Sequence, residues 1–178
     1  MSYIESWGKI HRSFGKPLFI CDKSDIEFNN IDSITYHGMG RSYGDVGINN
    51  NGTLICTKKY NRLISVDWDN GLIRAESGVT LNEILKLAVP RGWFLNVAPG
   101  TKYVSLGGAI ANDVHGKNHH NSGSFGNYVE KISLLKSDQS SHILSRDGNR
   151  DLFETTISGL GLTGFIEWAE IRLKKIGS

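Results

Sequence analysis

The sequence has only two cysteines, Cys21 and Cys56, among its 178 residues. They stand too far apart for a zinc-binding spacing, and two thiols cannot build the disulfide framework of small secreted domains. Because lone thiols are usual in a reducing compartment, we expect the protein in the cytoplasm. A chain of this length buries a core without covalent support, as one domain or as two small lobes that share a ligand.

Long hydrophobic runs and a dominant charge are also missing. Polar residues interrupt the N-terminal segment MSYIESWGKIHRSFGK every few positions, so we expect neither a signal peptide nor a membrane span. Lys and Arg number 20 against 18 Asp and Glu, which gives a formal net charge of +2. Such a balanced charge does not indicate a nucleic-acid surface and favours a small-molecule partner.

Several catalytic signatures are absent. The sequence has no Gly-x-Ser-x-Gly elbow, no Walker loop and no suitably spaced carboxylate pair, so hydrolase and phosphoryl-transfer functions have no support. The segment Gly159–Gly164 does match the dinucleotide pattern Gly-x-Gly-x-x-Gly. However, it follows a predicted helix and precedes a predicted strand, which inverts the Rossmann context and argues against a nicotinamide-binding fold.

Glycine, by contrast, is abundant, with 21 residues or about 12% of the chain against roughly 7% on average. One cluster forms the segment Gly38–Asp45, directly after a predicted strand. Backbone N–H groups that no side chain blocks can cradle a pyrophosphate, whereas a lone Gly-x-Gly more often forms a solvent turn. Arg41, Ser42 and Tyr43 add a cation, a hydroxyl and an aromatic face, and they favour the anion cradle.

A second glycine-rich stretch runs from Pro99 to Ala111. Ser105 is placed to cap a short helix of small residues, which would let a ligand approach the backbone closely. The alternative is a tightly packed structural helix.

Three histidines fall within the segment Asn112–His120. A metal site is possible in principle, but Gly116 and Asn118 disfavour the helix that would align His115 with His119. We therefore predict no metal, and a polar loop along a cofactor with His115 and Asn118 as hydrogen-bonding groups. The other histidines are isolated, and we expect them on the surface or in loops; they are His11, His37 and His142.

The pattern of elements predicts an α+β fold. A capping box at Thr80–Glu83 opens a helix that Pro90 and Gly92 end. Strands are expected at 31–36, 54–57, 63–68, 72–76, 131–136, 141–145 and 165–173, the last with a charged outer face, and a further short helix at 151–157.

Four segments together resemble the FAD-binding, PCMH-type domain of the vanillyl-alcohol oxidase and p-cresol methylhydroxylase superfamily. They are GMGRSYGD, APGTKYVSLGGAIANDVHGKNHH, GSFGN and GLGLTGFI. Within the superfamily they look most like the decaprenylphosphoryl-ribose 2-oxidase family. The resemblance runs from about Trp7 to Lys175, and DVHGKNHH combined with GSFGN is more specific than any single glycine pattern.

The resemblance implies an α+β fold of two lobes with FAD between them, lobe 1 about residues 1–50 and lobe 2 about residues 51–178. It also implies an oxidoreductase that oxidises a secondary alcohol of a sugar or polyol, the hydride passing to flavin N5. By the same resemblance, the first loop would surround the pyrophosphate and the segment Asn112–Gly116 would run beside the isoalloxazine. The residues expected to bind FAD are Gly38, Met39, Gly40, Arg41, Ser42, Tyr43, Gly44, Asp45, Gly100, Thr101, Ser105, Leu106, Gly107, Gly108, Asn112, Asp113, Val114, His115, Gly116 and Ile166.

Two departures from the family refine the expectation. Relatives that tether FAD through histidine carry it just after the second glycine of the first loop, where this chain has Arg41, so FAD should bind non-covalently. Members also continue into a substrate domain that this sequence does not include. We therefore expect a substrate domain or a separate polypeptide as partner, and a flavin-binding module without turnover is the alternative.

Overall fold

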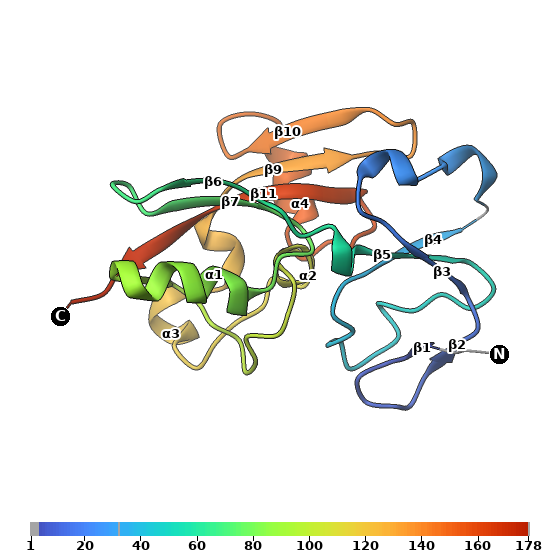
Figure 1. Ribbon diagram of the computed structural model, residues 1–178, viewed down its shortest axis with the longest axis horizontal. Helices are drawn as coiled ribbons and strands as arrows, with labels where there is room; N and C mark the ends of the chain where they lie inside the picture. Colours follow the sequence, from blue (N-terminus) through green and yellow to red (C-terminus); the bar gives the residue numbers. More distant parts are fainter. Residues whose placement is uncertain (1–3, 32, 178) are drawn as a thin grey trace.

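Two β-sheets of unequal size organise the chain in the computed structural model, which describes residues 4–31 and 33–177. The smaller sheet and an N-terminal hairpin lie on one side of the molecule, and the larger sheet with the α-helices lies on the other (Figure 1). The predicted α+β class is confirmed.

The small sheet has three parallel strands in the order β3-β5-β4. They span β3 Lys16–Phe19, β4 Ile34–His37 and β5 Thr53–Cys56. The predicted strand at 31–36 thus begins later, and residue 32 lies outside the described residues. Since β5 pairs with β3 and β4, the small sheet extends past the lobe boundary expected near residue 50.

Short elements surround this sheet. The strands β1 Ile4–Glu5 and β2 Arg12–Ser13 form the N-terminal hairpin. Two 3₁₀ helices lie between β3 and β4, and they are η1 Lys23–Asp25 and η2 Phe28–Asn30. A third, η3 Thr57–Lys59, follows β5.

The large sheet is antiparallel, in the order β10-β9-β11-β7-β6, with β8 added on β11. The strands expected at 63–68 and 72–76 are present as β6 Leu63–Asp67 and β7 Leu72–Glu76, and they pair as an antiparallel hairpin. Asp67 Oδ1 accepts hydrogen bonds from the backbone of Asp69 and Asn70 and so fixes the turn. The other strands are β8 Trp93–Leu95, β9 Val129–Leu135, β10 Ser141–Ser145 and β11 Phe165–Lys175.

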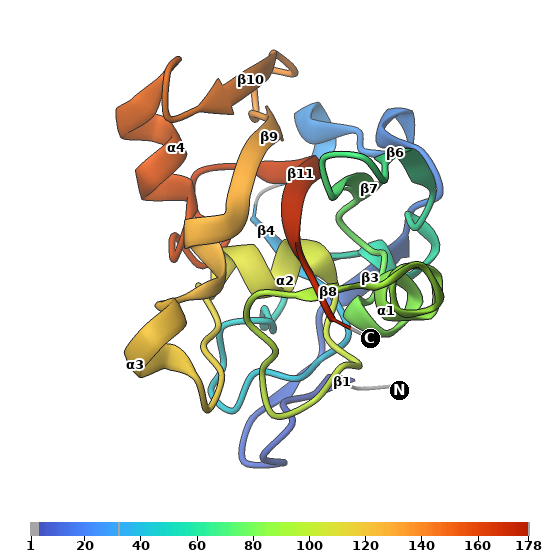
Figure 2. The same cartoon turned by 90° about the vertical axis from the view of Figure 1, so that its left-hand side faces the viewer.

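Helices pack on the large sheet (Figure 2). The capping box of Thr80 and Glu83 opens α1 Leu81–Ala88, and η4 Val89–Arg91 leads to Gly92 at a φ of 77°. Further along lie α2 Leu106–Ala111, α3 His119–Ser122, η5 Phe125–Tyr128 and α4 Arg150–Thr156. The expected helix at 151–157 is thus present as α4. The loop expected through His120 instead contains the single turn α3.

Two hydrophobic cores support these units. The larger joins the sheet to its helices through residues such as Ile84, Ile110 and Ile132, all fully buried. The smaller core gathers Ile20, Ile55 and Tyr60 of the first part of the chain with Leu135 and Phe165 of the large sheet. The large sheet therefore contributes to the core of the small one.

The predicted charged outer face of β11 is wrong at Glu167, which is only 4% exposed. The pairing of β11 with β9 shifts register between Ile166 and Trp168, so Glu167 is an extra residue in a β-bulge. The bulge breaks the alternation of the strand, and three consecutive residues from Phe165 are buried.

Candidate functional site

A cleft of about 680 Å³ lies where the carboxyl ends of β4 and β5 face α2 and the start of β11. Its volume is within the range of about 300–1,000 Å³ that small-molecule sites usually have. The walls come from the N-terminal hairpin, the first glycine loop, Ser77, the segment around α2, and the residues before and at the start of β11.

The first glycine loop forms one wall. Gly40 adopts a φ of +61°, a left-handed conformation that glycine tolerates best. A Cβ on Gly38 would collide with Ser105 Oγ, so the first loop touches the start of α2 directly.

His37, expected at the surface or in a loop, instead ends β4, is half-buried and lines the cleft. Its Nδ1 lies 2.6 Å from Gly47 O and its Nε2 would lie 3.3 Å from a Cβ on Gly40. The His37 ring, at the end of β4, thus lies next to Gly40 of the loop and within hydrogen-bond distance of Gly47 O after it.

Arg41 carries the cation of this wall. Its guanidinium lies 4.2 Å from the centre of the Trp7 ring, a cation–π contact. The backbone N–H of Trp7 donates to Ser42 O at 3.2 Å, so the N-terminal hairpin is fixed on the loop. Sequence reasoning missed Trp7 because the hairpin's contact with residue 42 depends on tertiary structure.

The start of α2 forms the opposite wall. Ser105 Oγ accepts a hydrogen bond from the backbone N–H of Gly108, the predicted N-cap. Gly107 N donates to Ser77 O at 2.8 Å, and a Cβ on Gly107 would lie 2.7 Å from Ser77 Cβ. The absence of a side chain at Gly107 thus lets the helix pack against Ser77.

Two buried polar atoms on the cleft lack a partner. Within the described part of the chain, Arg41 Nε and Ser77 Oγ are the buried side-chain nitrogen or oxygen atoms without a hydrogen bond. An unsatisfied buried polar group costs about 1–3 kcal/mol. Since both residues line the same cleft, a bound ligand with acceptor atoms would satisfy them, and the FAD pyrophosphate and ribityl oxygens fit this requirement.

Aromatic rings form the inner wall. Tyr36 and Phe165 both line the cleft, and their rings stack at 5.3 Å between centroids. Burial raises the pKa of Tyr36 to about 12, so its hydroxyl is neutral at physiological pH.

The histidine segment lines the cleft only in part. Asn112, Val114 and His115 reach it, and the exposed His115 ring lies 5.7 Å from the His119 ring. Asn118, expected to face the cofactor, instead donates to Asn96 O and Ser122 Oγ at 2.9 Å. Among residues 4–31 and 33–177 no group of three or more His, Cys, Asp or Glu side chains could hold a metal ion.

Most residues predicted to bind FAD meet along this cleft. These are Gly38, Met39, Gly40, Arg41, Ser42, Tyr43, Gly44, Gly100, Thr101, Ser105, Gly107, Gly108, Asn112, Val114, His115 and Ile166.

Four predicted residues lie outside the lining. Asp45 is exposed, Leu106 is fully buried in the large core, and Gly116 packs against Ala98 O. Asp113 turns away with a φ of 39°, and its Oδ1 accepts a hydrogen bond from Gly126 N at 2.7 Å. None of these four residues lines the cleft.

Leu160, Gly161 and Gly164 line the cleft although only Ile166 of the GLGLTGFI segment was expected there. The pattern Gly-x-Gly-x-x-Gly at Gly159–Gly164 is the sequence signal for this contact. It does not by itself indicate a ligand site, because it lies between a helix and a strand in the reverse of the Rossmann order. The backbone N–H of Leu160 donates to Ala111 O at 2.8 Å, which places this loop beside the end of α2.

The fold and the glycine-lined cleft together define an FAD-binding domain. The chain matches the family described as "FAD binding domain" over residues 29–144, and it belongs to that family. The resemblance recognised from the motifs is thereby confirmed.

Named relatives are oxidoreductases. The chain is 43% identical to decaprenylphosphoryl-beta-D-ribose oxidase of Mycolicibacterium smegmatis over 137 residues, 76% of this chain and 30% of that protein. It is 29% identical to L-gulonolactone oxidase 3 of Arabidopsis thaliana, over 68% of this chain and 22% of the relative. It is also 29% identical to human Delta(24)-sterol reductase, over 62% and 22%. The chain thus spans less than a third of each of these proteins. Within its described residues, no helix is both long and apolar enough to cross a membrane.

Proposed function

We propose that the chain binds FAD non-covalently in the cleft between the small sheet β3-β5-β4, with its glycine loop, and the large sheet with helix α2. The observation that carries the proposal is the pair of unpartnered buried atoms, Arg41 Nε and Ser77 Oγ, on opposite walls of one cleft. Arg41 would pair with the pyrophosphate, and the Ser77 hydroxyl would donate a hydrogen bond to a cofactor oxygen.

The glycine walls support the same assignment. Gly38, Gly40 and Gly44 of the first loop line the cleft and carry no side chain of their own, and Gly107 and Gly108 bring the start of α2 to the same cleft. Backbone donors at such positions bind phosphate groups without steric conflict. Non-covalent binding follows from Arg41, which occupies the position where tethered relatives carry histidine.

We further propose that the parent protein oxidises a secondary alcohol of a sugar or polyol. Two of the relatives carry the names of a ribose-derivative oxidase and a gulonolactone oxidase, which supports this class of donor. When bound, FAD would supply the hydride acceptor, and the cleft residues would hold and orient it.

The proton of the alcohol needs a base within hydrogen-bond reach. The candidates in this chain are Tyr43, 76% exposed, and His115, also exposed. Neither is enclosed in a pocket that excludes water, so we propose that a substrate domain or separate polypeptide supplies the base. The same exposure favours the second candidate function, a flavin-binding module without turnover of its own.

The test is titration of the purified chain with FAD and with FMN, followed by flavin fluorescence. We expect FAD to bind and to raise the melting temperature, and FMN to do so less because it lacks the adenylate and the pyrophosphate. Acid precipitation should then release the yellow colour into the supernatant. Failure of FAD to bind would refute the proposal, and a yellow pellet would refute its non-covalent part.

A further inference from the structure

Two buried carboxylates lie beside the cleft without lining it. Glu76 and Glu167 have side chains only 5% exposed, and each is the direct neighbour of a residue that does line the cleft, Ser77 and Ile166 respectively. Carboxylates are rarely buried unless they are paired. The residues that pair with these two carboxylates therefore show which segments of the chain are joined beside the cleft.

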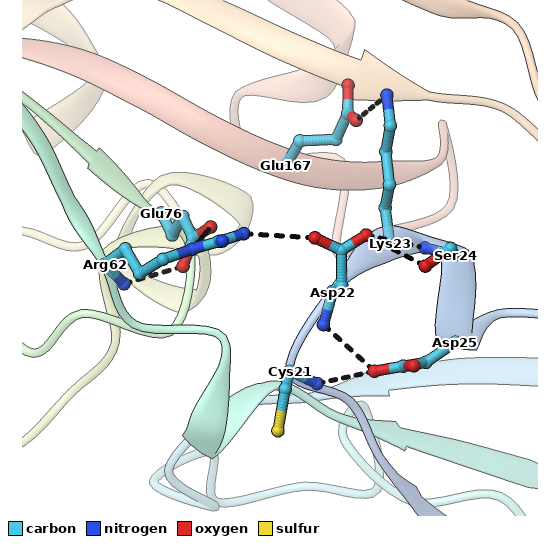
Figure 3. A network of polar contacts seen from close by, with 8 residues as sticks. All are labelled: Cys21, Asp22, Lys23, Ser24, Asp25, Arg62, Glu76 and Glu167. Carbon is cyan, nitrogen blue, oxygen red and sulfur yellow. Dashed lines mark hydrogen bonds and ion pairs between the residues drawn. The ribbon is translucent and has the colours of Figure 1, made fainter.

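The partners come from other parts of the chain (Figure 3). Glu76 accepts hydrogen bonds from the backbone N–H of Arg62 at 2.6 Å and from Arg62 Nε at 2.7 Å. Glu167 pairs with Lys23 Nζ at 2.9 Å and accepts the Ser133 hydroxyl at 2.6 Å. Lys23 belongs to η1, so this ion pair joins the first part of the chain to the large sheet.

Asp22 connects the two pairs. Its Oδ2 lies 3.2 Å from Arg62 Nη2, while its Oδ1 caps η1 by accepting the Ser24 N–H. Hydrogen bonds from Ser24 and from Arg62 keep the pKa of Asp22 below its ordinary value. The start of η1 is thus connected to both buried carboxylates: Lys23 pairs directly with Glu167, and Asp22 reaches Glu76 through Arg62.

Backbone contacts connect the carboxylates to the cleft walls. Ser77 N donates to Glu167 O at 3.0 Å, and Ser77 O accepts the N–H of Gly107 at the start of α2. On the other side, η1 follows β3, which lies in the same sheet as β4 and its glycine loop. The ionic contacts therefore join the unit that carries one wall to the unit that carries the other.

We propose that these charged residues form a clasp that sets the separation of the cleft walls and thereby controls FAD affinity without touching FAD. The clasp consists of Asp22, Lys23, Arg62, Glu76 and Glu167. The inference rests on the proposed function, because it assumes that FAD bridges both walls. Its residues are positioning residues, and FAD binding and clasp formation strengthen each other.

The test compares the FAD dissociation constant and the apo melting temperature of the wild-type chain and of Lys23→Met. We expect the variant to bind FAD about 5-fold to 150-fold more weakly, the usual range of coupling between two sites. Lys23→Arg should restore most of the affinity, because it restores the cation.

The matched control is Arg172→Met. Arg172 is 47% exposed, close to the 50% of Lys23, and pairs with Glu130 across β11 and β9, six residues along the strand from Ile166. Its removal should change FAD affinity by no more than about twofold, as for a surface substitution.

The outcomes separate the two proposals. If the wild-type chain does not bind FAD, the proposed function fails and the clasp inference fails with it. If the wild type binds FAD and Lys23→Met lowers the melting temperature of the apo and loaded forms equally with an unchanged dissociation constant, only the clasp is refuted. Should Lys23→Met not fold, Asp22→Asn decides, because its one oxygen can still cap η1 while the acceptor opposite Arg62 becomes an uncharged NH2 group, which removes both the charge and the hydrogen bond; unchanged affinity there refutes the clasp.

Discussion

Replacement of Ser77 by alanine should stabilise the apo protein and weaken FAD binding at the same time. The Ser77 hydroxyl is buried without a partner in a residue 4% exposed, so the apo protein carries a desolvation cost of about 1–3 kcal/mol. Alanine removes that cost and keeps the Cβ that packs near Gly107. The apo free energy of unfolding should therefore rise by an amount up to that value.

The loss of FAD affinity follows from the same atom. A hydrogen bond to a charged group contributes about 1.5–3 kcal/mol, which corresponds to a dissociation constant about 10-fold to 150-fold higher if Ser77 donates to the pyrophosphate. A bond to a neutral cofactor oxygen would give about 0.5–1.5 kcal/mol. Urea unfolding of the apo protein and an FAD titration measure the two effects separately.

Ser133→Ala is the matched control. Ser133 is 3% exposed, but its hydroxyl donates to the buried Glu167 at 2.6 Å, so its removal should destabilise the protein by about 1–3 kcal/mol. The reasoning is refuted if Ser77→Ala destabilises the apo protein as Ser133→Ala does, or if it leaves the FAD dissociation constant unchanged.

Three further predictions concern the loop, the pH dependence and the activity. Gly38→Ala should destabilise the protein by about 1–3 kcal/mol in urea unfolding because its Cβ collides with Ser105 Oγ, whereas Gly44→Ala, with no atom within 4 Å of its Cβ, should have no effect; equal stability of the two variants would contradict this. Burial raises the pKa of Tyr36 from its ordinary value of 10.0 to about 12. Between these two values the unfolded chain loses the Tyr36 proton while the folded protein keeps it, so the free energy of unfolding is at its full value below pH 10 and falls by up to about 3 kcal/mol as the pH rises to 12. Tyr36→Phe should flatten that part of the stability profile, and an unchanged slope would show that other groups cause it. The FAD-loaded chain should not reduce its flavin rapidly when mixed anaerobically with aldoses, polyols or polyprenyl-phosphate pentoses; rapid bleaching by one of them would show a complete active site.

Local signals in the sequence predicted much of the fold. The capping box of Thr80 and Glu83, the turn between the strands expected at 63–68 and 72–76, and the cap at Ser105 each depend on hydrogen bonds between residues two or three positions apart. Interactions of that range are encoded in neighbouring residues, so helix starts and hairpin turns can be read directly. The glycine pattern also indicated both cleft walls, since it reports where a backbone must stay uncovered.

Only the tertiary structure decided which distant residues share the site. Nothing near Ser77 in the sequence shows that its hydroxyl is buried beside Gly107, and nothing near Trp7 shows that its ring lies over Arg41. The β-bulge that buries Glu167 likewise depends on its pairing with β9. The sequence by itself determined the local turns, the helix caps and the glycine-rich loops. Strand register and the packing of residues far apart along the chain determined the unpartnered hydroxyl, the buried carboxylates and the shape of the cleft.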